Sequence, residues 1–232
     1  MVLALMFKSL WPTHCLICLQ TVSASNPIEH LCSDCLDLLP WNAPACAHCA
    51  QPLPTAQTYC AHCLGKPLRQ QRSYILFHYT APISDWIHAA KFEASFIHCH
   101  LLSQLLSHTL AHRSTPWPQC VLPMPLHSRR LRQRGYNQAI EIARTVCERF
   151  EIPMDKQSLQ RHRYSQPQSK LALKERKDNV DDSFQLQKAL SVSHIALLDD
   201  VTTSGNTLEA ASRALLMQGP LELEYWCIAK PF

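Results

Sequence analysis

Residues 197–207 read LLDDVTTSGNT, and this stretch decides the fold of the larger part of the chain. An apolar run over residues 194–198 stops at two adjacent acids, Asp199 and Asp200, and a hydroxyl-rich loop follows. The run predicts a buried strand, and the loop leads into a helix that we predict over residues 207–217. Because ligands of parallel sheets bind beyond the carboxyl ends of the strands, the loop is a candidate binding site.

The residue types in this loop indicate a phosphorylated sugar. A helix N-terminus attracts phosphate through its free N–H groups and its dipole, and Gly205 lets the backbone approach the anion. Two carboxylates beside a phosphate are unfavourable unless the same ligand also offers vicinal hydroxyl groups, as a ribose 5-phosphate does. The loop is not a Walker P-loop, because the pattern GxxxxGK[ST] is absent. The predicted site residues are Asp199, Asp200, Val201, Thr202, Thr203, Ser204, Gly205, Asn206 and Thr207.

Strand and helix patterns alternate around this loop, which predicts an α/β fold with a mostly parallel sheet. Residues 74–80, 120–124, 194–198 and 223–229 have the character of strands. Residues 83–113, 136–150 and 207–217 have the apolar spacing of helices. The composition changes near Gly65, so we expect one domain over residues 1–65 and a second over residues 66–232.

Twelve cysteines are present, and eight of them form four CxxC pairs before residue 64. Two such pairs supply the four thiolates of one structural zinc site, so four pairs predict two zinc ions. We favour zinc over disulfides because no export signal is recognisable, and over a dithiol redox site because one pair would be enough for that. The predicted ligands are Cys15, Cys18, Cys32, Cys35, Cys46, Cys49, Cys60 and Cys63.

The distribution of the cysteine pairs between the two ions has two solutions. A sequential arrangement joins the first pair with the second and the third with the fourth, whereas a cross-braced arrangement joins the first with the third and the second with the fourth. We favour the sequential arrangement because it closes shorter loops.

Charge and hydropathy restrict the environment of the protein. The net charge is +4, yet residues 1–65 carry one lysine against three acids and residues 66–232 carry 21 lysines and arginines against 15 acids. A polyanion should therefore meet the second domain first. No apolar run is long enough to span a bilayer, and the N-terminus lacks the features of a signal peptide, so we expect a cytoplasmic protein.

Three segments resemble known families. LLDDVTTSGNT resembles the phosphoribosyl-pyrophosphate (PRPP) loop of type I phosphoribosyltransferases. Residues 122–139 (LPMPLHSRRLRQRGYNQA) and 161–184 (RHRYSQPQSKLALKERKDNVDDSF) resemble signature segments of the ComF family, as do the cysteine pairs and Lys91-Phe92. The resemblance covers essentially the whole chain, with Ser165 standing where threonine is more usual. It implies a double zinc ribbon followed by a phosphoribosyltransferase-like domain that binds PRPP with Mg²⁺. It also implies that Asp199 and Asp200 bind the ribose hydroxyls and that residues 202–207 hold the 5-phosphate.

Several basic residues are candidates for binding pyrophosphate or DNA. Arg129 and Arg130 follow the strand at 120–124, where this fold holds pyrophosphate. The polar segment 161–179 is either a flap that closes over the pyrophosphate or a surface for nucleic acid. A solvated basic surface is the alternative for both groups. The candidates are Lys91, Arg129, Arg130, Arg161, Arg163, Lys170 and Arg176.

Two functions remain open from the sequence. The first, which we favour, is a PRPP-binding protein that handles incoming single-stranded DNA in natural transformation or DNA utilization. The family resemblance would bring such a protein to the inner face of the membrane, with a helicase or another DNA-processing partner. The alternative is an active Mg²⁺-dependent phosphoribosyltransferase on an unidentified acceptor, for which no general base stands out. The two functions differ in one requirement, because an enzyme must consume PRPP whereas a binding protein need not.

Overall fold

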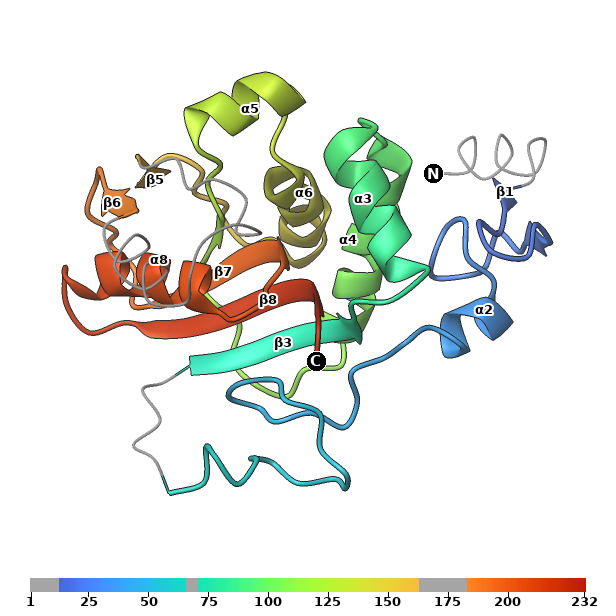
Figure 1. Cartoon of the computed structure of the whole chain (residues 1–232), viewed down its shortest axis with the longest axis horizontal. Helices are drawn as coiled ribbons and strands as arrows, with labels where there is room; N and C mark the ends of the chain where they lie inside the picture. Colours follow the sequence, from blue (N-terminus) through green and yellow to red (C-terminus); the bar gives the residue numbers. More distant parts are fainter. Residues whose placement is uncertain (1–12, 66–70, 163–182) are drawn as a thin grey trace, which may run out of the picture.

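A parallel four-stranded sheet forms the centre of the molecule (Figure 1). The computed structural model describes residues 13–65, 71–162 and 183–232. Each pair of neighbouring strands in the sheet is parallel, which confirms the predicted α/β class. In spatial order the strands are β3 (Gln71–His78), β8 (Glu222–Lys230), β7 (His194–Val201) and β4 (Cys120–Pro123).

Helices cover both faces of this sheet, and the alternation of side chains along β7 shows how. Ala196 and Leu198 belong to the core that the sheet forms with α3 (Ile83–Phe92), α4 (Phe96–Leu110) and α6 (Gln138–Phe150). Ile195 and Leu197 belong to the opposite core, with α8 (Asn206–Leu216). A strand buried on both faces has an uninterrupted apolar sequence, as residues 194–198 have.

Three elements beside the cleft differ from what the sequence predicted. The helix expected over residues 83–113 is two helices, because the chain turns at Ala94, which has a left-handed φ of 51°. The strand expected to end at residue 198 continues to Val201, so that both aspartates lie on β7. Residues 128–134, for which no helix was predicted, form the short helix α5 (Ser128–Arg134), which begins where the His127 side chain accepts a hydrogen bond from Arg129 N–H and ends before Gly135.

A small antiparallel pair of strands forms a separate sheet. It consists of β5 (Leu159–Arg161) and β6 (Phe184–Leu186), which belong to the two ends of the segment that includes residues 163–182. Those residues lie outside the described part of the chain, and with them most of the expected flap.

The cysteine-rich segment packs against the edge strand β3. Its regular elements are β1 (Thr13–His14), β2 (Thr21–Val22) and α2 (Ser33–Asp37), and in Figure 1 the chain that follows them runs beside β3. Trp41 bridges to Phe77, and Ser73 N–H donates to Ala47 O (2.9 Å). The expected domain boundary, between residues 65 and 66, adjoins residues 66–70, which lie outside the described residues, and it stays a prediction.

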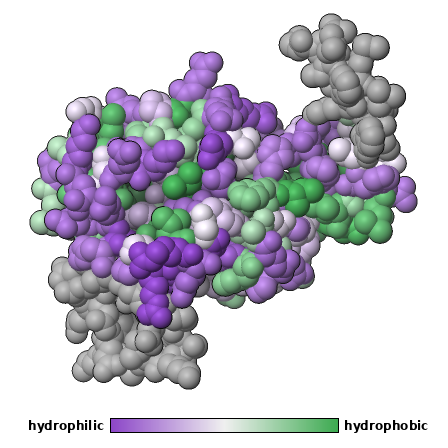
Figure 2. Space-filling view, turned by 90° about the horizontal axis from the view of Figure 1, so that it is seen from above, coloured by the Kyte–Doolittle hydropathy of each residue, from purple (hydrophilic) through white to green (hydrophobic). Residues whose placement is uncertain are grey.

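The described surface is mixed in polarity. Figure 2 shows a largely hydrophilic face, with hydrophobic surface gathered toward the end that carries β1 and α2. Within residues 13–65, 71–162 and 183–232, no helix combines the length and the hydropathy needed to cross a bilayer.

Candidate functional site

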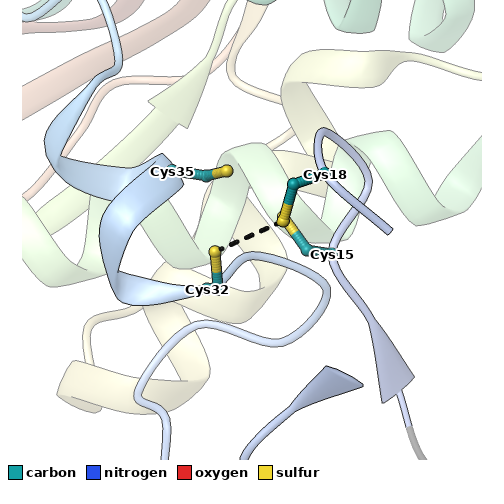
Figure 3. Close-up of side chains that lie close together, drawn as sticks. All are labelled: Cys15, Cys18, Cys32 and Cys35. Carbon is teal, nitrogen blue, oxygen red and sulfur yellow. Dashed lines mark hydrogen bonds between the residues drawn. The ribbon is translucent and has the colours of Figure 1, made fainter. Parts of the chain in front are cut away.

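The first two cysteine pairs converge on one point. Cys15 and Cys18 come from the turn after β1, whereas Cys32 precedes α2 and Cys35 lies on it (Figure 3). Their four sulfur atoms lie within 4.8 Å of one another, and Cys18 Sγ and Cys32 Sγ are 3.7 Å apart. A tetrahedron of sulfurs about 2.3 Å from a zinc ion has edges of about 3.8 Å, so the spacing fits zinc. It is far longer than a disulfide of about 2.05 Å.

The third and fourth pairs repeat this arrangement with Cys46, Cys49, Cys60 and Cys63. Cys49 Sγ and Cys60 Sγ are again 3.7 Å apart. The two groups confirm the sequential arrangement of the pairs and exclude the cross-braced one. Four thiolates leave no position for water or substrate, so both groups fit structural zinc ions.

The first and third pairs share one turn geometry. Cys15 N–H donates to Gln20 O (2.8 Å), and Cys46 N–H donates to Gln51 O (2.9 Å). The fourth residue after each cysteine, Leu19 or Ala50, has a positive φ. This turn points the two sulfurs of each CxxC pair to the same side, as a shared metal ion requires.

A cleft of about 620 Å³ lies beyond the carboxyl ends of β4 and β7. The end of α3, the segment between β4 and α5, α5 itself, β5 and the start of α8 surround it. The predicted site residues that line it are Lys91, Arg130, Arg161, Asp199, Asp200, Val201, Thr203, Ser204 and Thr207.

The acid pair in this cleft is electrically asymmetric. Lys91 Nζ lies 2.6 Å from Asp200 Oδ2, and the Asp200 side chain is only 5% exposed. Burial alone raises the pKa of Asp200, but the charge and hydrogen bond of Lys91 outweigh it, so that the pKa lies below its ordinary value. Burial and the charge of Asp200 raise the pKa of Asp199 well above its ordinary value. Asp199 therefore keeps its proton to a higher pH than an ordinary aspartate does.

The hydroxyl loop has two sides. Thr203, Ser204 and Thr207 line the cleft, and Gly205, with φ 81°, is the left-handed residue that immediately precedes α8. Thr202 is buried instead, and its N–H donates to Ala229 O (3.1 Å).

The other side of this loop faces the cysteine-rich segment. A second hollow of about 630 Å³ separates the loop from the second cysteine group, and Thr202 and Gly205 line it together with His48 and His62. Asn206, the first residue of α8, lines neither hollow.

The arginine candidates also differ in whether they line the cleft. Arg130 and Arg161 line the cleft, whereas Arg129 is exposed and outside its lining. Burial, followed by the like charge of Arg130, lowers the pKa of Arg161, so an anion in the cleft would relieve a repulsion. The other three candidates, Arg163, Lys170 and Arg176, lie outside the described residues.

Sequence reasoning assigned no role to Phe92, Arg134 or Gln138, which also line the cleft. Arg134 donates to Gln138 Oε1 (2.5 Å), and its guanidinium carbon lies 5.3 Å from the centre of the Phe92 ring. The i, i+4 spacing of Arg130 and Arg134 was the available signal, because it places both on one face of a helix.

Comparisons with known proteins agree with the sequence patterns. A family model of the double zinc ribbon domain matches residues 6–64. DNA utilization protein YhgH of Salmonella typhi is 33% identical over 171 residues, which cover 72% of this chain and 75% of that protein. Competence protein F of Haemophilus influenzae is 31% identical over 179 residues, which cover 72% of this chain and 77% of that protein. The chain belongs to the ComF family of these proteins. That finding confirms the resemblance stated from the sequence.

Two solved structures of phosphoribosyltransferases also show a distant similarity. The purine phosphoribosyltransferase of Pyrococcus horikoshii has a TM-score of 0.33 at 11% identity, over 69% of this chain and 87% of that one. The adenine phosphoribosyltransferase of Leishmania tarentolae has a TM-score of 0.40 at 10% identity, over 71% of this chain and 93% of that one.

Proposed function

We propose that this protein binds PRPP, or a related ribose phosphate, with Mg²⁺ and acts on incoming single-stranded DNA during DNA uptake or utilization. The observation that carries the PRPP part is the cleft itself. It brings an acid pair held by Lys91, a hydroxyl loop at the start of α8 and the guanidinium groups of Arg130 and Arg161 around one space. Those three groups match the hydroxyls, the 5-phosphate and the pyrophosphate of PRPP.

Each part of the ligand has a partner in this proposal. Asp199 and Asp200 accept hydrogen bonds from the ribose hydroxyls, and the loop 203–207 holds the 5-phosphate at the α8 N-terminus. Arg130 and Arg161 bind the pyrophosphate. The carboxylate oxygens of the acid pair also suit Mg²⁺, which prefers oxygen ligands together with phosphate groups. When bound, Mg²⁺ neutralises charge on the pyrophosphate.

The DNA part of the proposal is supported by the names of the relatives and by charge. YhgH is named a DNA utilization protein and competence protein F a competence protein. The excess of positive charge lies in residues 66–232, which include the cleft. We place the protein in the cytoplasm, working at the inner face of the membrane beside a helicase or another DNA-processing partner.

A ligand-induced thermal shift tests the PRPP site. At PRPP about 100-fold above its Kd, with Mg²⁺ present, the melting temperature of the wild-type protein should rise by about 5–10 °C. The Asp199→Asn, Asp200→Asn double variant should lose this rise. Asp85→Asn removes an exposed carboxylate outside the cleft and should keep it. No rise in the folded wild type, or an equal rise in all three proteins, would refute the proposed site.

Fluorescence anisotropy with a labelled oligonucleotide tests the DNA part. The wild-type protein should bind single strands with an affinity that falls as salt increases, and the Arg130→Ala, Arg161→Ala variant should bind more weakly. Binding that no salt concentration affects would contradict this part. Release of pyrophosphate from PRPP when the strand is present would favour the transferase alternative over a binding role.

A further inference from the structure

An exposed aromatic ring stands at the rim of the cleft. Phe92 is the last residue of α3, 66% of its surface is exposed, and it lines the cleft beside Lys91. The helix ends here because the chain turns at Ala94, so two successive residues reach the same space. Leaving this much of a phenylalanine in water forgoes most of the free energy that its burial would contribute.

Charged and polar groups surround this ring in a way that suits a planar ligand. The Arg134 guanidinium lies over the ring, with its carbon 5.3 Å from the ring centre, and the His88 ring lies 4.8 Å from it. Gln133, exposed and lining the cleft, offers an amide. Aromatic rings and guanidinium planes stack on nucleobases, and amides and guanidinium groups form hydrogen bonds with base edges.

The surroundings of Phe92 are fixed before any ligand binds. The Tyr136 hydroxyl donates to Ala90 O. This hydrogen bond joins the end of α3 to the segment between α5 and α6. Phe96, at the start of α4, packs against the same tyrosine with ring centres 4.9 Å apart. Gln138 holds Arg134 from the next helix. A platform held in this way loses little conformational entropy when a ligand stacks on it.

We propose that Phe92 and Arg134 form a nucleobase subsite of the cleft. The cleft then binds a whole nucleotide, with the base on Phe92, the sugar at the acid pair and the 5′-phosphate at the start of α8. This inference rests on the proposed ribose phosphate site and adds the class of ligand, a nucleoside 5′-phosphate that is either free or the 5′ end of a DNA strand. A cleft of about 620 Å³ is within the size range of small-molecule sites.

The test compares two probes that differ by the base. Calorimetric titrations with ribose 5-phosphate and with AMP are run on the wild-type protein, Phe92→Ala and Phe92→Trp. Phe92→Ala should weaken AMP binding by roughly 5- to 150-fold and change ribose 5-phosphate binding by less than about twofold. Phe92→Trp should restore AMP binding. The control is Phe232→Ala, which removes a partly exposed aromatic residue that packs against His78 outside the cleft and should change neither affinity.

The outcomes separate this inference from the proposed function. Ribose 5-phosphate binding with AMP affinity unchanged in Phe92→Ala would overturn the subsite and leave the ribose phosphate site standing. Equal weakening of both probes would also overturn it, because the residue would then support the cleft as a whole. No binding of either probe to the wild-type protein would overturn the ribose phosphate site, and the subsite with it.

A second comparison identifies the source of the nucleotide. Single strands with a 5′-phosphate and with a 5′-hydroxyl are titrated into the same proteins. Loss of affinity in Phe92→Ala for the phosphorylated strand alone would assign the subsite to a strand end. If AMP responds to the substitution and neither strand does, the ligand is a free nucleotide.

Discussion

Lys91 Nζ lies 2.6 Å from Asp200 Oδ2 at the carboxyl end of β7, where Asp200 has Asp199 as its immediate neighbour. Lys91 thus forms an ion pair with one of two adjacent carboxyl groups. It favours the ionised form of Asp200, and the resulting charge opposes the ionisation of Asp199.

Asp199→Asn should stabilise the protein more at pH 8 than at pH 5. The pKa of Asp199 is raised above its ordinary value of 3.8 in the folded protein, so its contribution is fully present below that value and is lost as the pH rises through the raised pKa. Asparagine imitates the protonated form and avoids this loss. The melting temperature relative to wild type should increase by about 3 °C or more between the two pH values. A difference that does not depend on pH would contradict the assignment.

Lys91→Met should destabilise the protein more at pH 8 than at pH 5. The substitution keeps an apolar side chain but leaves the buried Asp200 without its cation. Because Asp200 can then take up a proton at lower pH, the cost is reduced there. We expect a loss of about 1–3 kcal/mol in the free energy of unfolding at pH 8, measured by urea denaturation. Wild-type stability at pH 8 would show that the ion pair contributes nothing.

Arg130→Ala should weaken PRPP binding, and Arg129→Ala should not. The two arginines are adjacent on α5, but only Arg130 lines the cleft. Loss of one charge-assisted hydrogen bond corresponds to roughly 10- to 100-fold in affinity. Ribose 5-phosphate lacks the pyrophosphate, so its affinity should stay within about twofold of wild type in both variants. Equal effects of the two substitutions on PRPP would refute the assignment of Arg130.

Cys60→Ser should lower the zinc content from two ions per chain to one, because Cys60 belongs to the second group of four cysteines. Cys99→Ser provides the control, since this buried cysteine belongs to neither group and its loss should leave both ions bound. Metal analysis by mass spectrometry of the purified proteins gives the count. Two ions in Cys60→Ser would contradict the assignment of Cys60 as a ligand, because the second group would then hold its zinc without this thiolate.

Glu224→Gln should destabilise the protein without changing its affinity for PRPP. Arg113 Nη2 lies 2.6 Å from Glu224 Oε1, and both side chains are almost completely buried. The pair lies toward the amino end of β8, away from the cleft, and removal of one partner of a buried pair costs about 3–5 kcal/mol. Urea denaturation measures the loss, and Glu222→Gln, an exposed change on the same strand, should cost little. A loss below about 1 kcal/mol would contradict a supporting role for the pair.

The predictions that the structure confirmed depend on residues that are close together in the sequence. The CxxC pairs predicted the residues of the two cysteine groups, because residues three apart can bring both sulfurs to one metal ion without any distant contact. The apolar run before Asp199 predicted a central strand because a strand buried on both faces can have no polar alternation.

The features that escaped prediction depend on tertiary structure. Ala94 adopts its left-handed turn without a glycine to mark it, so the break between α3 and α4 was not recognised. The helix α5 has no buried residue and therefore no apolar period. The contact of Lys91 with Asp200 joins residues that are distant in sequence, and only the folded arrangement places the end of α3 beside the end of β7.

The most direct test of the central claim is a calorimetric titration of the zinc-loaded protein with PRPP and Mg²⁺, repeated in two buffers that differ in ionisation enthalpy. We predict saturable binding to the wild-type protein, with release of protons at any pH where Asp199 is still protonated before binding because the ligand favours its carboxylate form, and no binding to the Asp199→Asn, Asp200→Asn variant. A folded wild-type protein that does not bind PRPP, or a double variant that binds it equally well, would contradict the claim that this cleft is a ribose phosphate site.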